Sequence, residues 1–498
     1  MNQSINVLYI GYNDLLQDQH LENLQVHQCH DIKDITGEYQ VVIIDMILSS
    51  NELDCIMSYI PTHGCFITEN VVEYYGLESF VYRKQAKVIK EYDIAFLKKL
   101  PFRFYVGHKA EKLPLQHIGV NRSFRGTVAF EGRQYILLKG DFGNRWKQTC
   151  FWKDGIEADS KMPLSLWLEY IKDDDVHIQL YIEEIKKETL GEICYEKIID
   201  EDMMKEPFVL DELPCNGIIN FSLRVTGKGL LKIGSLHIRQ SRYEEGFYLP
   251  GDSRFYDYKR QELFAYFDPG DMKPPLNVFF SDYHLQEGFE GYEMMKTMNS
   301  PFILFSDPRL DGGSFYIGSE EYESQLREFI QNKMNVLHFN EKDLIFTGLS
   351  MGSYAALYYG CDFSPNSIII GQPLTNLGSV AKNETIFRPE VFPTSLDVLR
   401  QNGLCELSDV AVEELNNRFW KKFDRSKLEG TKIVSSYMKN DDYDKDAFSC
   451  LTTHSINKNN TIYGKGIEGR HNDNKDAIVN WYHLQYERIL KEDFDRGE

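Results

Sequence analysis

The segment of residues 344–357 constrains the fold more strongly than any other part of the chain. An apolar run leads directly into the pattern Gly-x-Ser-x-Gly at residues 348–352, and small, helix-forming residues follow it. This succession is typical of a nucleophile elbow, in which a buried strand ends, the chain turns sharply and a serine hydroxyl is exposed at the tip. Glycine suits both Gly348 and Gly352, because a Cβ at either position would clash at so tight a turn. The pattern therefore predicts that Ser350 is a nucleophile at the edge of an α/β sheet.

Two polar loops follow the elbow, each directly after a predicted strand. The strand at 432–437 is followed by an acidic cluster that includes Asp441 and Asp442, and the strand at 461–463 is followed by a glycine-rich segment that ends in His471. In α/β-hydrolases the serine, the acid and the histidine occur in this order along the chain. Because each group follows a sheet strand, we expect the three loops to meet at one edge of the sheet.

These residues have distinct expected roles. Serine is a weak nucleophile at neutral pH and needs a base that is itself held by a third group. We predict that His471 takes the proton of Ser350 and that Asp441 orients the imidazole. Asp441 is preferred because it lies at the expected reach beyond the strand end, with Asp442 as the alternative acid and Asp444 as the third choice.

The tetrahedral intermediate of acyl transfer also needs backbone N–H donors near the serine. The amide of Met351, directly after the nucleophile, is one expected donor. The second should come from the loop after the predicted strand at 277–281, where the Tyr283 amide is the preferred candidate. His284 in the same loop is a candidate for contact with the substrate.

Three other patterns have competing interpretations. His454 is a second candidate base, but no clear strand precedes it. Residues 464–469 match the dinucleotide-binding pattern G-x-G-x-x-G. They open a histidine loop rather than the first βα unit of a domain, so we interpret them as a flexible segment that positions the histidine. Residues 442–446 resemble the start of a calcium loop, but Ala447 and Thr453 stand where Gly and Glu are required. The sequence therefore predicts neither a metal ion nor a bound cofactor.

The charge balance and the cysteines narrow the class of protein. The 498 residues include 55 basic and 76 acidic side chains, which gives a formal net charge of −21. Nucleic-acid and anionic-membrane binders carry a basic excess, so neither ligand is expected. Nine scattered cysteines without a C-x-x-C pair fit a reducing compartment with unpaired thiols. The first residues do not form a signal peptide and no apolar run reaches the ~20 residues of a membrane span, so we expect a soluble, cytoplasmic protein.

The first two parts of the chain differ in the pattern of their predicted elements. Residues 1–121 alternate apolar strands with helix-compatible stretches, which predicts a Rossmann-like α/β domain. Residues 122–253 contain short alternating strands without helices, which favours a β-sandwich. Its three tryptophans have two interpretations, namely stacking on sugar rings or ordinary sandwich core. The three tryptophans are Trp146, Trp152 and Trp167. Strands are predicted at 6–11, 41–45, 64–68, 127–130, 134–138, 176–182, 218–225 and 230–234, and a turn at 226–229.

Residues 254–498 return to the α/β pattern and are predicted to form an α/β-hydrolase-like catalytic domain. Residues 254–275 are expected to be a connector, because proline, glycine and aspartate interrupt them. Residues 382–428 are expected to be an insertion before the sixth strand. The predicted elements are strands at 277–281, 302–306, 344–347, 367–370, 432–437 and 461–463, and helices at 320–334, 391–402, 409–423 and 474–490.

Several short strings together resemble the second protein of the accessory Sec system, a family that serves the export of serine-rich glycoprotein adhesins in Gram-positive bacteria. The resemblance covers nearly the full length of the chain. One departure is Asp282, which stands where the family leads us to expect glycine. The matching strings lie at residues 279–283, 287–292, 347–353, 441–444 and 469–471.

The resemblance implies a triad-dependent O-acetyltransferase that acts on N-acetylglucosamine carried by the adhesin, with the triad at Ser350, Asp441 and His471. It further implies a cytoplasmic complex with the first and third accessory Sec proteins. Association with the accessory SecA motor and the adhesin preprotein is also implied, at the inner face of the membrane. Neither the residues nor the resemblance identifies the acetyl donor. Two alternatives stay open, a carbohydrate esterase that uses the same acyl-enzyme and a non-catalytic export scaffold.

Overall fold

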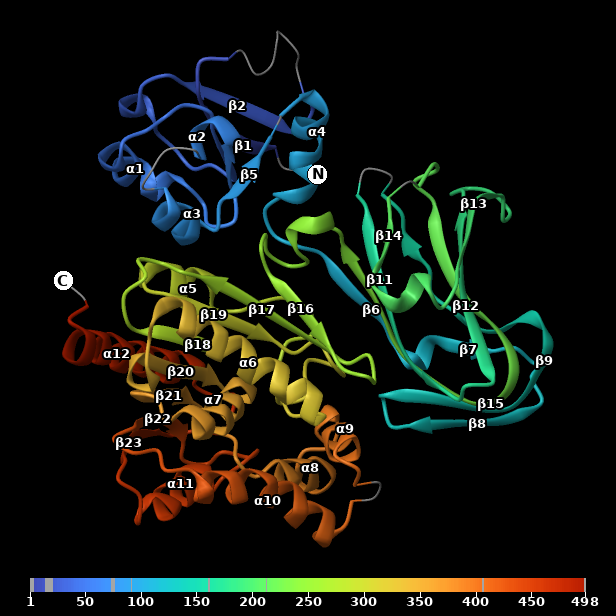
Figure 1. Cartoon of the computed structure of the whole chain (residues 1–498). Helices are drawn as coiled ribbons and strands as arrows, with labels where there is room; N and C mark the ends of the chain where they lie inside the picture. The colour runs from blue at the N-terminus through green and yellow to red at the C-terminus, as the bar shows by residue number, and fades with distance from the viewer. Residues whose placement is uncertain are drawn as a thin grey trace.

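The computed structural model describes residues 4–13, 21–72, 77–90, 92–159, 162–211, 213–404 and 407–496. Within these ranges the strands form three sheets, of five, ten and eight strands, which follow one another along the chain (Figure 1). The chain is therefore a mixed α/β protein with several sheets, as the sequence predicts at that level. Among the described helices, none combines the length and the apolar character that a membrane crossing requires.

The first sheet is parallel throughout, with the order β2-β1-β3-β4-β5. Its inner strands are hydrophobic on both faces because a separate apolar cluster covers each side. The predicted strands at 6–11, 41–45 and 64–68 correspond to β1, β3 and β4. The edge strand β2 escaped prediction because half of its side chains are polar and exposed. The bounds are β1 (Ile5–Ile10), β2 (Leu24–Cys29), β3 (Val41–Ile44), β4 (Cys65–Thr68), β5 (Lys87–Ile89), α1 (Ser50–Ile56), α2 (Glu69–Val72), α3 (Glu78–Lys84) and α4 (Ile94–Arg103).

The second sheet is antiparallel and folds around one apolar core cluster. Its long strands β9 and β15 pair with each other along most of their length, and β15 also pairs with β6, β10, β11 and β12. The bounds are β6 (Ala110–Leu113), β7 (Ile118–Val120), β8 (Gly126–Glu131), β9 (Tyr135–Trp152), β10 (Ile156–Glu157), β11 (Leu164–Lys172), β12 (Val176–Ile185), β13 (Ile193–Ile199), β14 (Phe208–Leu210) and β15 (Ile218–Gln240).

The prediction of a turn at 226–229 is wrong, because these residues lie inside β15, a continuous strand of 23 residues. The glycines serve close approach within the sheet instead. At Gly227, with φ +96°, a Cβ would lie 1.8 Å from the carbonyl oxygen of Asp175 on the paired side. The register against β9 shifts on both sides of this glycine, so the local irregularity is a bulge rather than a chain reversal.

The cysteines also differ from the prediction of unpaired thiols. Cys194 on β13 and Cys215, just before β15, form a disulfide in the structure, with their Cα atoms 6.6 Å apart. The two residues are 21 positions apart in the sequence, so no short motif marks the pair. The other cysteines of the described ranges are free.

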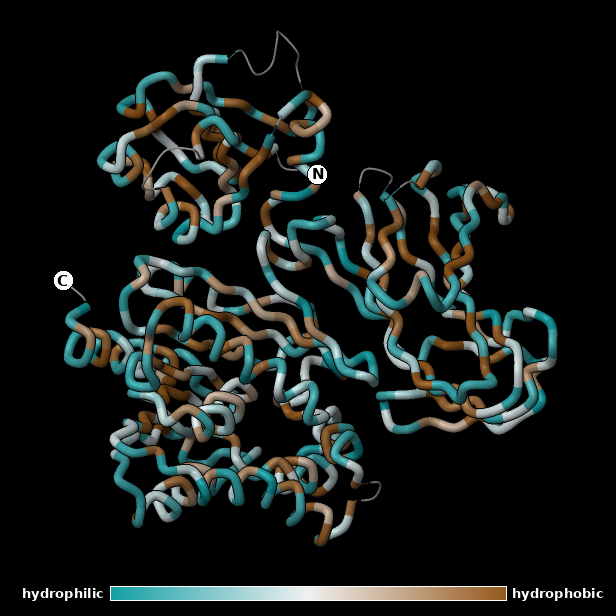
Figure 2. The backbone as a smooth tube through the Cα atoms, in the orientation of Figure 1, coloured by the Kyte–Doolittle hydropathy of each residue, from teal (hydrophilic) through white to brown (hydrophobic). Residues whose placement is uncertain are grey.

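The third sheet has the order β16-β17-β19-β18-β20-β21-β22-β23 and is parallel from β19 to β23. Apolar clusters cover both of its faces, and its inner strands are among the most hydrophobic segments of the chain (Figure 2). The bounds are β16 (Ser253–Tyr256), β17 (Glu262–Asp268), β18 (Leu276–Phe280), β19 (Phe302–Ser306), β20 (Leu344–Leu349), β21 (Ser367–Gly371), β22 (Lys432–Met438) and β23 (Thr461–Ile467).

Two expectations for this sheet are wrong. The predicted connector at 254–275 contains most of the antiparallel pair β16 and β17, and every residue of β17 is buried. The segment 464–469, interpreted above as a flexible loop, lies in β23 as far as Ile467, where it pairs with β22. The glycine there again permits close packing, since a Cβ on Gly464 would meet the carbonyl oxygen of Ser435 at 2.4 Å.

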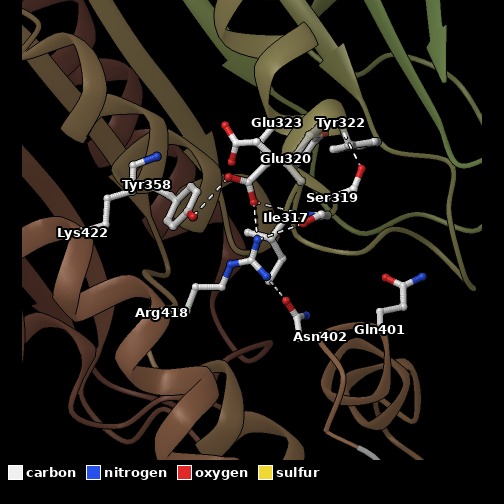
Figure 3. A network of polar contacts seen from close by, with 12 residues as sticks. Ile317, Ser319, Glu320, Tyr322, Glu323, Tyr358, Gln401, Asn402, Arg418 and Lys422 are labelled. Carbon is white, nitrogen blue, oxygen red and sulfur yellow. Dashed lines mark hydrogen bonds and ion pairs between the residues drawn. The ribbon is translucent and has the colours of Figure 1, made fainter. Parts of the chain in front are cut away.

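The described part of the insertion between β21 and β22 contains three helices, α8, α9 and α10, where the sequence predicts two. A polar network joins helix α10 of this insertion to helices α6 and α7 (Figure 3). Arg418 on α10 donates to the carboxylate of Glu323 on α6 and to the carbonyl of Gly318, and Tyr358 on α7 donates to the same carboxylate. The helix bounds are α5 (Tyr292–Thr297), α6 (Glu320–Leu337), α7 (Met351–Phe363), α8 (Leu377–Ile386), α9 (Thr394–Gln401), α10 (Asp409–Arg425), α11 (Ala447–Ser455) and α12 (Lys475–Phe494).

A buried ionic cluster joins the second sheet to the third. Arg239 on β15 donates to both carboxylate oxygens of Glu262 on β17, at 3.0 and 2.6 Å. It also donates to Glu287, which lies in the loop between β18 and α5 and contacts His237 of β15. Each of these four side chains is at most 3% exposed. The loop after β18 is therefore held by charges that belong to the neighbouring sheet.

Candidate active site

Ser350 occupies a strained turn between a strand and a helix. Strand β20 ends at Leu349, α7 begins at Met351, and Ser350 between them has φ +46° and ψ −111°. The turn is tight because Gly352 packs against the neighbouring strand, where a Cβ would lie 2.2 Å from the carbonyl oxygen of Phe280. A non-glycine residue with positive φ costs free energy and persists only where the surroundings enforce it.

This strain predicts that glycine at position 350 stabilises the fold. We expect Ser350→Gly to raise the free energy of unfolding by about 1 kcal/mol, because glycine adopts positive φ without the Cβ clash. Thermal unfolding is the measurement. Ser350→Ala is the matched control, since it also removes the hydroxyl but keeps the Cβ. Equal unfolding temperatures for the two variants would contradict the prediction.

The structure brings the three predicted side chains together. Ser350 Oγ lies 2.9 Å from Nε2 of His471, and Nδ1 of the same ring lies 2.8 Å from Oδ2 of Asp441. Asp441 follows β22 and His471 follows β23, so the carboxyl ends of three strands supply the three groups. His471 is 3% exposed, and its ring packs on that of Tyr443 with 4.2 Å between centroids. The arrangement provides a hydroxyl, a base and an orienting carboxylate in hydrogen-bonding sequence.

The neighbouring acids have separate contacts. Asp442 accepts a hydrogen bond from the backbone N–H of His471 at 3.0 Å and does not contact its ring. Asp444 is buried and accepts from the backbone amides of Thr375 and Asn376, both at 2.7 Å. Of the three candidate acids, Asp441 is therefore the one that touches the imidazole.

Burial alone would raise the pKa of Asp441. The hydrogen bond and charge of His471 and the backbone amides of Tyr443 and Asp444 outweigh that effect, so the pKa of Asp441 lies below its ordinary value. The carboxyl group is therefore ionised at neutral pH, as an orienting group for an imidazolium must be.

His454, the competing base, lies elsewhere. Its ring stacks on that of Trp420 with 4.2 Å between centroids, and its Nδ1 lies 2.7 Å from Oδ1 of Asp424. It contacts the insertion helix α10 rather than the serine turn. His284, proposed above as a substrate contact, has both ring nitrogens on carbonyl oxygens of its own loop, those of Asp282 at 2.7 Å and Gly288 at 3.2 Å. It braces the loop after β18.

The two predicted oxyanion donors converge on one atom of the protein. The backbone N–H groups of Met351 and Tyr283 both donate to Oδ1 of Asp282, at 3.0 and 2.6 Å. The structure thus places the two amides close together beside the serine. Asp282 lies between them, and its side chain is the acceptor.

Sequence reasoning missed two further neighbours of the histidine. Gln372, directly after β21, donates its side-chain amide to the carbonyl oxygen of His471. Tyr443 covers the imidazole and is itself covered by Arg388, whose guanidinium carbon lies 3.7 Å from the tyrosine ring centroid. No local motif marks Gln372 or Arg388, because only the fold brings Gln372 to the histidine and Arg388 to Tyr443.

The tryptophans of the second sheet divide between core and surface. Trp152 and Trp167 are 3% and 1% exposed, whereas Trp146 is 44% exposed. Trp152 forms part of the wall of a cavity of about 480 Å³ that also has polar side chains, including Gln148 and Asn220. The burial of Trp152 and Trp167 fits the interpretation as core, and stacking on sugar stays the open alternative.

Comparison with known proteins gives a consistent result. The family model described as "Accessory Sec system GspB-transporter" matches residues 2–496. The chain is 39% identical over 402 residues to accessory Sec system protein 2 of Staphylococcus aureus. The aligned residues cover 80% of this chain and 76% of the relative. It is 39% identical over 401 residues to the protein of that name from Streptococcus gordonii, which covers 80% and 78%. A chain of the Glycosylation Associate Protein (Gap123) complex from Streptococcus agalactiae has a TM-score of 0.90 and 34% identity, with 99% of both chains covered.

Proposed function

This chain belongs to the Accessory Sec system GspB-transporter family, and from that premise we propose that it is a serine-dependent O-acetyltransferase acting on the glycan of an exported adhesin. The residues 254–498 are the proposed catalytic unit, of the α/β-hydrolase type. The acceptor is N-acetylglucosamine on a serine-rich repeat protein, as the resemblance of the sequence implies. The nucleophile is Ser350, the base His471 and the orienting acid Asp441.

The observation that carries the proposal is the continuous hydrogen-bonded series from Ser350 through His471 to Asp441, at 2.9 and 2.8 Å. Both distances lie within the reach that proton transfer to and from a catalytic histidine requires. A vestigial site would have no need to keep the strained serine turn, since glycine there would relieve the strain.

The reaction has two halves with one acyl-enzyme between them. Ser350 Oγ attacks the acyl carbonyl carbon of the donor while its proton passes to Nε2 of His471. The bond from that carbon to the leaving group then breaks, and His471 returns the proton to the leaving group. In the second half a sugar hydroxyl gives its proton to His471 and attacks the ester carbonyl. The bond to Ser350 breaks, the serine regains its proton, and the acetylated sugar leaves with no net oxidation or reduction.

The proposed partners follow from the family rather than from the site. A structural relative is a chain of the Gap123 complex, so we propose that this chain assembles with the first and third accessory Sec proteins. The accessory SecA motor and the adhesin preprotein are the further proposed partners, and the inner face of the membrane is the proposed location. The net charge of −21 does not favour a nucleic acid as a further partner.

Mass spectrometry of adhesin glycans from cells that carry Ser350→Ala tests the activity. We expect the O-acetyl mass on N-acetylglucosamine to disappear while the adhesin is still exported. Ser449→Ala, an exposed serine on α11, is the matched control and should leave acetylation unchanged. Acetylation that persists in the Ser350 variant would overturn the transferase. Export that fails as fully as on deletion, with acetylation normal, would favour a scaffold instead.

A further inference from the structure

The oxyanion site is filled by a side chain of the protein itself. Oδ1 of Asp282 accepts hydrogen bonds from the backbone N–H groups of Met351 at 3.0 Å and Tyr283 at 2.6 Å. These are the two amides that the sequence predicts as donors to the oxyanion. Donors of this kind lie about 2.7–3.1 Å from the position that the developing negative oxygen takes. The carboxylate oxygen of Asp282 therefore stands where the oxygen of the tetrahedral intermediate has to be.

The two oxygens exclude each other. Each amide has one hydrogen, and in the structure both hydrogens are directed at the aspartate. A second negatively charged oxygen at the same place would meet both the volume and the charge of the carboxylate. Ser350 cannot pass through a stabilised tetrahedral intermediate while Asp282 remains there.

The backbone beneath this carboxylate is firmly fixed. The N–H of Asp282 donates to Oε2 of Glu290 at 2.7 Å, and the N–H of Glu290 donates to the hydroxyl of Ser281 at 3.1 Å. His284 holds the carbonyl oxygen of Asp282 at 2.7 Å. Since the main chain is braced on both sides, rotation of the aspartate side chain is the simplest motion that clears the hole.

The electrostatic setting favours a carboxylate that leaves readily. Burial of this group raises the pKa of Asp282 and the charge of Glu290 raises it further, against the opposing effect of the two amide donors. The negative charge is thus held in place chiefly by the two N–H groups. When the carbonyl oxygen of an acyl donor accepts hydrogen bonds from these two N–H groups, the Asp282 side chain loses most of the interactions that hold it in the hole.

We propose that Asp282 is a gate residue that determines which acyl groups Ser350 accepts, by occupying the oxyanion hole until a donor displaces it. This inference rests on the proposed function and deepens it. A small activated ester has little binding energy with which to displace the carboxylate, so it reacts slowly. A donor that binds through a larger leaving group can displace it, and futile hydrolysis of acyl groups by water is suppressed in the resting protein.

The test uses the full-length protein and two small probes, a fluorophosphonate that labels activated serines and p-nitrophenyl acetate. In Asp282→Ala we expect labelling of Ser350 and ester hydrolysis to be about ten- to a hundred-fold faster than in the unaltered protein, because the hole is open. Asp282→Asn should give a smaller increase, since its amide oxygen still fits the hole without the charge. Glu293→Ala, an exposed acid on α5, removes one charge nearby and should change neither rate.

The outcomes separate the gate from the nucleophile. Equal rates in Asp282→Ala and the unaltered protein, or a slower rate in the variant, would overturn the gate and leave the nucleophile intact. Absence of labelling at Ser350 in every variant would overturn the proposed function, and the gate with it. Thermal unfolding checks that each variant is folded. A crystal structure of the labelled protein should show the phosphoryl oxygen on the amides of Met351 and Tyr283, with the Asp282 carboxylate displaced; an unmoved carboxylate would refute the gate.

Discussion

Asp441→Asn is expected to lower the rate of Ser350 acylation by about 10⁴-fold, the size of effect that loss of an orienting carboxylate has in serine enzymes. The reason lies in the second oxygen of the carboxylate. Oδ1 of Asp441 accepts the backbone N–H groups of Tyr443 at 2.8 Å and Asp444 at 3.1 Å. An asparagine would keep its amide oxygen on these donors and turn its NH₂ group toward Nδ1 of His471. That nitrogen would then act as an acceptor, the proton would sit on Nε2, and the imidazole could not receive the proton of Ser350.

Asp442→Asn is the matched control for this prediction. Oδ1 of Asp442 accepts the backbone N–H of His471 at 3.0 Å, and an asparagine oxygen in the same place accepts it equally well. We expect its acylation rate to stay within a few-fold of the unaltered protein, on the scale of about 1 kcal/mol for one neutral hydrogen bond. The measurement is the rate at which an activated acetyl ester adds to Ser350, followed by intact-protein mass spectrometry. A large loss in Asp442→Asn with little change in Asp441→Asn would reverse the assignment of the acid.

The elements of the third sheet could be predicted because their signals are local. Strand β20 is a short apolar run, and the glycines on either side of Ser350 mark the turn that follows it. The buried strands β18, β19 and β21 also show as short apolar runs, since both faces are covered. The order of serine, acid and histidine then follows from which strands carry the loops.

Other features depend on contacts that sequence patterns do not encode. Gly227 and Gly229 look like a turn, but both lie within one long strand. A Cβ on Gly227 would meet the backbone of Asp175, and a Cβ on Gly229 would meet the side chain of Asp173. The place of Asp282 between two amides depends on its side-chain rotamer and on its contact with the N–H of Met351 at the start of α7. The pairing of His237 with Glu287 joins positions 50 residues apart across two sheets. Such features appear only once the chain is folded.

Removal of Glu287, the partner of His237, is expected to cause the largest change in stability. Glu287 is 3% exposed and accepts hydrogen bonds from Arg239 at 2.5 Å and from the Tyr248 hydroxyl at 2.9 Å, in addition to its contact with His237. Glu287→Ala leaves the charge of Arg239 only partly compensated by Glu262. We expect a loss of about 3–5 kcal/mol, which is typical when one partner of a buried ion pair is removed. Glu293→Ala, an exposed acid on α5, is the control and should unfold like the unaltered protein.

The same cluster sets the response of stability to acid. Burial alone would raise the pKa of Glu262, but Arg239 and Arg254 lower it from 4.5 to about 2, and the pKa of Glu287 is lowered well below its ordinary value. A carboxyl group whose pKa is lower in the folded state stabilises the fold above its unfolded pKa, and this contribution is lost as the pH falls toward the folded pKa. The unfolding temperature of the unaltered protein should therefore fall steeply between about pH 5 and about pH 2.

Glu287→Gln distinguishes this account from a general effect of acid on the chain. Glutamine keeps the shape of the side chain and cannot titrate, so the variant should start from a lower unfolding temperature at neutral pH and lose less of it on acidification. If the unfolding temperatures of the two proteins fall in parallel as the pH is lowered, groups other than Glu287 cause the acid sensitivity. Because Glu287 lies in the same loop as Asp282 and Tyr283, the variant should also acylate Ser350 more slowly, since the loop that carries the proposed oxyanion donor loses its buried anchor. A variant with lowered stability but an unchanged acylation rate would show that the joint between the sheets supports the fold without positioning the loop.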